Sequence, residues 1–264
     1  MTGAVDLYIE GNTPLHRLDP RVKVFGLLAL FAALLAFNHP LYVAFMTAGV
    51  LATALAGRAM PNLWRLRVMF TILFLFSLVL WPLMVRTGTP AAHIGPLVVT
   101  REGLLYGMAV GMRLAAMVAC GLIFLSTTRV EEFTAALHRL GVPFAMSFAL
   151  SLAFRFVPTF VDSAYTIIQA QKSRGLDLES GNALARLRHH VPLLIPAVVG
   201  AVRTTDLLAM ALEARGFGGS TPRTDYLELR ARGADYAALI LLLVVAAAAI
   251  WWRLAGHGAV LHRI

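Results

Sequence analysis

Charged residues are scarce in this sequence. Asp, Glu, Lys and Arg make up 14% of its 264 residues, whereas 59% of the residues are hydrophobic. This balance excludes a soluble domain and indicates an integral membrane protein. The net charge of +9 does not predict a nucleic-acid partner. The basic residues flank apolar runs instead of forming a stripe, which is the distribution typical of membrane proteins.

Motifs for nucleotide binding and hydrolysis are also missing. Lys occurs only twice, as Lys23 and Lys172, and neither follows a Gly, so a P-loop cannot form. Neither Gly-x-Ser-x-Gly nor His-Glu-x-x-His occurs. The single Cys120 excludes an intrachain disulfide and a Cys-based metal site. The adjacent His189 and His190 lack the i, i+4 spacing of helical metal ligands. We therefore predict a non-catalytic protein with no metal and no other cofactor.

Long apolar runs predict about five transmembrane helices. They cover roughly residues 22–37, 41–57, 68–85, 102–125 and 234–252, with loops at 58–67 and 86–101. Asp19 and Pro20 suit the N-cap and first position of the first helix. Residues 1–20 are polar, so no cleavable signal peptide is expected and the first span would act as its own insertion signal.

Small residues recur at every fourth position of the span 102–125. They are Gly103, Gly107, Gly111, Ala115 and Ala119. Such a stripe lets membrane helices approach closely, so we expect it to pack inside the bundle. Arg113 lies in the middle of this span and needs an internal partner, for which Asp162 is one candidate.

Between residues 126 and 217 the sequence changes character. Thr128 and Glu131 form a capping-box pattern before a short amphipathic helix at 130–140, too short to span a bilayer. Two longer helices, at 144–174 and 191–215, are apolar at first and then amphipathic. The predicted fold is an all-α integral membrane protein with about five transmembrane helices and three cytoplasmic or interfacial coupling helices. Its parts are a four-span membrane region (1–125), a coupling-helix region (126–217), and a polar loop with the final span (218–264).

Both longer helices end in the same way, with a small residue, an Arg and a Gly. The first end is Ser173-Arg174-Gly175 and the second is Ala214-Arg215-Gly216. Gly suits the left-handed residue that often terminates a helix, and Arg is favoured by the helix dipole while its guanidinium can still bind a carboxylate. Each end alone is typical of an ordinary C-cap. Their duplication favours two docking sites for a partner protein.

The distribution of Lys and Arg predicts the orientation in the membrane. With the N-terminus in the cytoplasm, the inner side carries Arg17, Arg21, Lys23 and most other basic residues, and the outer side few. Both Arg-Gly ends would then be cytoplasmic.

The sequence resembles the transmembrane coupling (T) component of energy-coupling-factor transporters, which are ABC-type importers of vitamins and of cobalt or nickel ions. The resemblance rests on the paired Arg-Gly motifs, on the interfacial segment ending Leu140-Gly141-Val142-Pro143, and on an N-terminal signature. That signature is Tyr8-x-x-Gly11-Asn12-Thr13-x-Leu15-His16-Arg17-Leu18-Asp19-Pro20-Arg21-x-Lys23. The one departure is Ser173, where the family usually has Ala.

This resemblance implies a scaffold in the bacterial cytoplasmic (inner) membrane that couples ATP hydrolysis to transport. Its partners would be two ATP-binding-cassette ATPase subunits, bound through the two Arg-bearing helices, and a substrate-binding membrane subunit (S component). The N-terminal signature favours a vitamin over cobalt or nickel as substrate. The main alternative is an autonomous secondary transporter or channel, and another is a purely structural membrane anchor. An inverted repeat of spans would favour a transporter, and none is visible.

Overall fold

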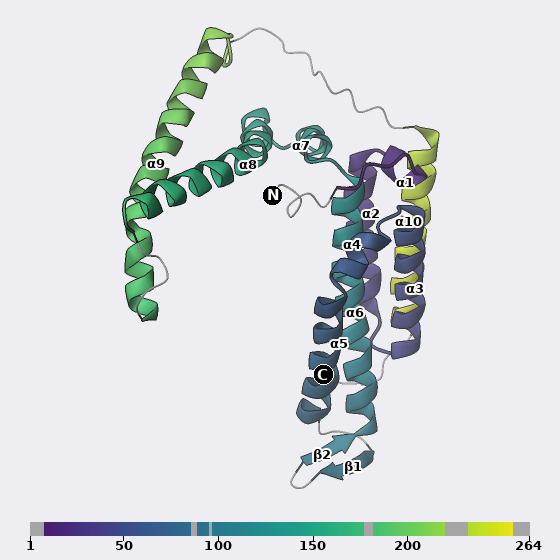
Figure 1. The fold of residues 1–264 in the computed structure, drawn as a ribbon. Coiled ribbons are helices and arrows are strands. Elements are labelled where there is room, and N and C mark those ends of the chain that lie inside the picture. Colours follow the sequence, from purple (N-terminus) through teal and green to yellow (C-terminus); the bar gives the residue numbers. More distant parts are fainter. Residues whose placement is uncertain (1–7, 86–88, 95–96, 177–181, 220–231, 256–264) are drawn as a thin grey trace. The chain divides into compact units, whose positions relative to one another are not determined.

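The computed structural model describes residues 8–85, 89–94, 97–176, 182–219 and 232–255 (Figure 1). The chain divides into two compact units. The first contains Met1–Leu140 and Leu229–Ile264, and the second contains Gly141–Glu228. The domain boundaries expected from the sequence, at 125 and 217, stay a prediction.

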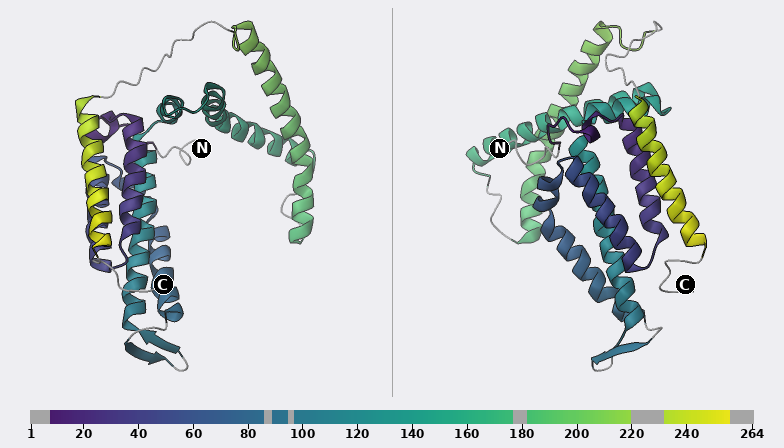
Figure 2. Two further views of the ribbon diagram at one scale, coloured as in Figure 1. Left: turned by 180° about the vertical axis from the view of Figure 1, so that it is seen from behind. Right: turned by 90° about the vertical axis from the view of Figure 1, so that its right-hand side faces the viewer.

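The first unit is a helical bundle with one small hairpin. Its elements are α1 (Pro14–Arg17), α2 (Pro20–Ala36), α3 (Pro40–Ala56), α4 (Met60–Arg65), α5 (Arg67–Met84), β1 (Pro90–Ile94), β2 (Leu97–Thr100), α6 (Arg101–Thr127), α7 (Val130–Arg139) and α10 (Gly233–Leu254). Helix α6 contacts α5, α3 and α2, and α10 lies beside α2 (Figure 2). Apolar side chains of these helices form the core, with Leu34, Val50, Ala116 and Ile123 among its buried members.

The predicted small-residue stripe of α6 packs against α5. A Cβ added at Gly107 would lie 3.0 Å from the Ser77 backbone oxygen, and one at Gly111 would lie 3.3 Å from the Phe74 Cα. The Ser77 hydroxyl also donates to the Gly107 carbonyl at 2.9 Å. Only Gly permits this approach of two backbones, so the packing role of the stripe is confirmed.

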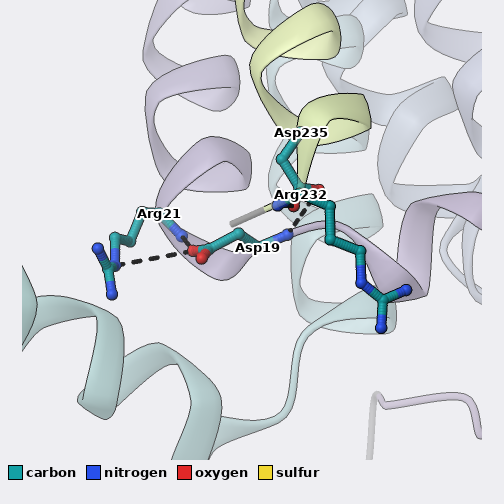
Figure 3. A network of polar contacts seen from close by, with 4 residues as sticks. All are labelled: Asp19, Arg21, Arg232 and Asp235. Atoms are coloured by element: carbon teal, nitrogen blue, oxygen red, sulfur yellow. Dashed lines mark hydrogen bonds and ion pairs between the residues drawn. The ribbon is translucent and has the colours of Figure 1, made fainter. Parts of the chain in front are cut away.

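A buried carboxylate joins the beginning of α10 to the beginning of α2 (Figure 3). The side chain of Asp235 is 2% exposed, and its Oδ1 accepts the Asp19 backbone N–H at 3.2 Å. Its Oδ2 accepts the Arg232 backbone N–H at 2.6 Å. The Asp19 carboxylate accepts the backbone N–H of Arg21 at 2.9 Å, which confirms Asp19 as the N-cap of α2. The two helices are therefore fixed at one end by backbone groups that would otherwise lack partners.

Five helices of the described chain are long and apolar enough to cross a membrane. They are α5, α6, α10, α8 (Phe144–Ser173) and the His190–Ala214 part of α9 (Ala183–Ala214). The all-α membrane fold is thus confirmed, but two of the five are the predicted coupling helices. The predicted spans α2 and α3 have 17 residues each. At 1.5 Å per residue each is about 26 Å long, close to the thickness of the hydrocarbon core.

Both predicted loops contain regular structure. Residues 58–67 include α4, where Asn62 is buried and donates to the Ser126 hydroxyl of α6 at 2.8 Å. Residues 86–101 include the antiparallel pair β1–β2, in which Ile94 faces Leu97 in register. The second strand is Leu-Val-Val-Thr, and β-branched residues of this kind favour extended backbone. Periodicity over so few residues could not have indicated either element.

The predicted capping box before α7 is wrong. Helix α7 begins at Val130 with Arg129 as its N-cap, and no side chain caps it. The Thr128 hydroxyl is buried without a hydrogen-bond partner. Since Thr128 lies one residue before the N-cap, its side chain cannot reach the first turn.

Arg113 has an internal partner, as expected, but the partner is not Asp162. Its guanidinium donates to the Phe37 carbonyl and, at 2.6 Å, to Asn38 Oδ1. Both acceptors lie where α2 ends, so Arg113 binds a carbonyl that the helix leaves free and meets the negative end of the α2 dipole. Asp162 lies on α8, is exposed, and belongs to the second unit. A backbone carbonyl carries no side-chain signal, so the sequence could not reveal this acceptor.

The second unit consists of α8 and α9. The predicted bounds of α8 are confirmed, whereas α9 begins at Ala183, eight residues before the predicted start. Among the residues of these two helices whose side chains the structure describes, Ser147 alone is buried. Large apolar side chains such as Phe154, Ile195 and Val198 are exposed. A helix pair with so much exposed apolar surface needs lipid or a partner to cover it. Residues 220–231, most of the predicted polar loop, lie outside the described chain.

Candidate functional site

The first Arg-Gly end closes α8 in a Schellman motif. Helix α8 ends at Ser173, Arg174 is the C-cap, and Gly175 follows with φ +88°. The Gly175 N–H donates to the Lys172 carbonyl at 3.0 Å, and the Leu176 N–H donates to the Gln171 carbonyl at 3.0 Å. This pair of bonds defines the motif. The Ser173 hydroxyl donates to the Gln169 carbonyl of its own helix at 3.1 Å, so Ser can replace the usual Ala without offering a free hydroxyl.

The second end repeats this geometry bond for bond. Helix α9 ends at Ala214, Arg215 is the C-cap, and Gly216 has φ +73°. The Gly216 N–H donates to the Glu213 carbonyl at 2.8 Å, and the Phe217 N–H donates to Leu212 at 2.9 Å. The left-handed turn makes Gly the favoured residue at both positions.

Both arginines are exposed. Among the described residues, neither Arg174 nor Arg215 has a hydrogen bond or ion pair from its guanidinium. Each therefore presents a planar fork of donors beside a rigid turn. A carboxylate or a row of carbonyls on another protein could accept bidentate hydrogen bonds from it.

An aromatic cluster holds the second motif against the beginning of α8. The Phe217 ring lies 4.6 Å from the Phe148 ring and 6.0 Å from the Phe144 ring, centroid to centroid. Arg174 lies at the other end of α8, 26 residues after Phe148, which corresponds to about 39 Å along the helix axis. The two Arg ends are thus at opposite ends of α8. One small ligand cannot bind both, whereas two subunits can.

Comparison with known proteins shows the family of the chain. Residues 11–226 match the cobalt transport protein family, CbiQ. The energy-coupling factor transporter transmembrane protein EcfT of Listeria innocua is 34% identical over 256 residues, which are 93% of this chain and 96% of the relative. The EcfT protein of Thermosediminibacter oceani is 35% identical over 242 residues, 88% of this chain and 91% of the relative.

The chain belongs to the T components of energy-coupling-factor transporters. It is a multi-pass membrane protein, and its relatives are named as transmembrane components of a transporter. A Bifidobacterium longum protein named as an ABC transporter ATP-binding protein also matches, at 35% identity over 248 residues. That match covers 88% of this T component but 32% of the relative.

The N-terminal signature of this T component makes contacts within the chain. His16 Nδ1 is 2.7 Å from the Thr13 hydroxyl, and His16 Nε2 is 2.9 Å from the Ile9 carbonyl. The Lys23 ammonium donates to the Thr127 carbonyl at 2.7 Å and to the His16 carbonyl at 3.3 Å. These side chains fix the first segment on α2 and α6. A structural role for His16, and not metal binding, fits these bonds.

Sequence reasoning missed two features around the site. The cluster of Phe144, Phe148 and Phe217 gave no signal, because aromatic residues are common in apolar helices. The buried position of Lys23 also gave none, since it was counted with the basic residues of the membrane boundary. Among the described residues, no group of three His, Cys, Asp or Glu side chains could hold a metal ion. The side chain of His189 lies outside the described set.

Proposed function

We propose that this T component is the scaffold of an ATP-driven importer in the bacterial inner membrane, with its N-terminus in the cytoplasm. It has no catalytic role: two partner ATPase subunits hydrolyse ATP and drive movement of a substrate-binding S component. The observation that supports this most directly is the duplicated Schellman end with a free Arg, one at each end of α8.

In this proposal Arg174 docks one ATPase subunit and Arg215 the other. Ser173, Gly175, Ala214 and Gly216 give each Arg the same rigid setting. The relative named as an ABC transporter ATP-binding protein contains a segment similar to this chain, which supports an association with ATP-binding subunits.

The exposed apolar faces of α8 and α9 would contact the S component and the bilayer. Both helices are long and apolar enough for a membrane, yet they bury almost nothing within the chain. Displacement of the ATPases would act on Arg174 and Arg215 and be carried along the two helices to this surface.

The substrate we propose is a vitamin, on the basis of the N-terminal signature. The family description names cobalt transport, so uptake of a metal ion is the competing outcome. Proteoliposomes with the chain, its ATPase pair and its S component should accumulate a labelled vitamin when ATP is supplied. Accumulation of cobalt or nickel instead would contradict the vitamin assignment but not the scaffold role.

The docking role is tested by removing the guanidinium group of each Arg. Truncating one partner of a buried charged pair typically costs about 2–5 kcal/mol, so Arg174→Ala and Arg215→Ala should each lose roughly 30-fold or more in ATPase affinity. Arg→Lys should also weaken binding because an ammonium cannot make the bidentate contact. Lys172→Ala and Arg203→Ala serve as controls at other exposed basic residues of the same helices. If the motif variants behave like these controls, the two ends are ordinary helix caps.

A further inference from the structure

A cavity of about 90 Å³ lies in the first unit, lined by residues of α1, α2, α3, α6 and α10. Nine of its thirteen lining residues are Leu, Val, Ile, Phe or Gly. The hydroxyls of Thr53 and Thr127 are bound to carbonyls of their own helices, at 2.7 and 2.8 Å. Apart from the weakly polar thiol of Cys120, the Lys23 ammonium is then the one polar group that these lining side chains offer.

The cavity is too large and too apolar to be filled by water. A bound water needs about 10–15 Å³ of such volume and two to four polar partners, so the space corresponds to roughly six to nine waters with almost no partners. Protein interiors otherwise pack closely, with few voids larger than one water. Several lining residues, including Leu15, Leu27 and Leu242, are partly exposed, so the cavity opens to the surface of the helix bundle.

Lys23 sets the chemistry at one end of the cavity. An ammonium has three N–H donors, and two of them bind the Thr127 and His16 carbonyls. The third has no partner among the described residues. Among the described residues, no carboxylate forms an ion pair with this ammonium. Its third N–H can donate to an acceptor that enters the cavity, such as an ester carbonyl.

The apolar wall continues from Lys23 along α2. From Lys23 to Leu30 the helix advances by about 10 Å, and Gly26 and Leu27 line the cavity between these two residues. Lys23 lies near the beginning of α2, at the expected membrane boundary, and Leu30 lies toward the middle of the span. A membrane lipid likewise has its polar part near the surface and its apolar part farther in, because its ester carbonyls lie near the membrane surface and its acyl chains run toward the middle of the bilayer.

We propose that this cavity binds the ester end of one acyl chain of a membrane phospholipid, whose carbonyl accepts the third N–H of Lys23, while the rest of the chain lies in the bilayer. The bound chain also supports α7. Phe124 lines the cavity, and its ring meets the Phe133 ring of α7 edge to face, with centroids 5.7 Å apart. Helix α7 contacts α2 as well. Loss of the lipid would leave Phe124 without packing on one side and loosen this short helix.

The test counts the phospholipid that stays with the full-length chain after purification in a sterol-based detergent without acyl chains. Mass spectrometry should find one phospholipid per wild-type chain. Leu27→Trp places a ring in the cavity and should lower retention about tenfold, since a packed space does not accept added bulk. Leu28→Trp is the matched control, because Leu28 is 57% exposed and does not line the cavity, and it should retain lipid as the wild type does.

A second pair of variants guards against misfolding of Leu27→Trp. Cys120→Leu should lose the lipid and Cys120→Ala should keep it. Added phospholipid should raise the unfolding temperature of the wild type and Leu28→Trp, but not of the filled variants, because a ligand stabilises only the protein that binds it. Lys23→Met should weaken retention while its apolar stem remains. Retention of free fatty acid alone, of no lipid, or of equal lipid by the Leu27 and Leu28 variants would overturn the proposal.

Discussion

Replacing Gly175 or Gly216 by Ala should weaken the proposed docking of the ATPases with no steric clash inside the chain. An added Cβ at either position has no atom within 4 Å, so the whole effect comes from the backbone. With φ at +88° and +73°, both residues are in the left-handed region. For an L-residue with a Cβ this conformation costs roughly 1–2 kcal/mol.

That cost sets the size of the effect. A change of about 1–2 kcal/mol alters an equilibrium roughly 5- to 30-fold, so the population of the closed Schellman turn should fall by up to that factor. If the ATPase binds only the closed turn, its apparent affinity falls in proportion to the population lost. The double variant should approach the product of the two single effects, since about 39 Å of helix separates the two ends.

The measurement is a titration of the purified chain with its ATPase pair, with thermal unfolding as a check on folding. Gly200→Ala, in the middle of α9, is the control, because its Cβ also meets nothing within 4 Å but its φ is negative. Gly→Asn at the two ends should retain much of the affinity, as Asn tolerates the left-handed region. Equal affinities for Gly175→Ala, Gly216→Ala and Gly200→Ala would refute the argument. If the Asn variants bind as weakly as the Ala variants, the partner requires the absence of a side chain at these positions and not the left-handed turn.

Three further predictions concern the stability of the first unit, measured as thermal or denaturant unfolding in detergent. Arg113→Ala should lower the free energy of unfolding by about 1.5–3 kcal/mol, because it removes charged hydrogen bonds to Phe37 and Asn38. Asn38→Ala should lower it by less, and the effects of the two substitutions should not add fully. Wild-type stability of Arg113→Ala would contradict these hydrogen bonds. Gly107→Ala should cost about 1–3 kcal/mol because its Cβ meets backbone, whereas Gly121→Ala, with nothing within 4 Å, should be neutral or stabilise; equal effects would disprove the close approach of α5 and α6. Asp235→Ala should cost about 1–3 kcal/mol by leaving two N–H groups unpaired, and an unchanged midpoint would show that the bonds of α10 to α2 contribute nothing.

Much of the fold could be predicted from the sequence because strong local signals coincide with long elements. Asp19 and Pro20 mark the beginning of α2, and the bounds of α8 followed from apolar periodicity and from Gly175. The stripe containing Gly107 predicted close packing, although its partner helix α5 came only from the structure. The prediction that Thr128 caps α7 failed because the N-cap is the next residue, Arg129. Side-chain type alone does not locate a helix boundary to within one residue.

The candidate site divides along the same line. The two Arg-Gly ends are local, so their turns could be expected from a few consecutive residues. The contacts of Arg113 and the cluster around Phe217 join residues about seventy positions apart. Such pairings depend on how helices pack, and a single sequence holds no record of that.

The hydrogen bond between Asp235 and Asp19 joins residues 216 positions apart, and this fixes an order of events during synthesis. At 5–20 residues per second, the ribosome needs roughly 10–40 s to reach Asp235 after it has made Asp19. During that interval the face of α2 that will receive α10 is open to lipid or to the insertion machinery, while the whole of the second unit is made. The first unit is therefore completed last, and a nascent chain that stalls after α9 would already carry both Arg ends on a bundle that lacks its final helix.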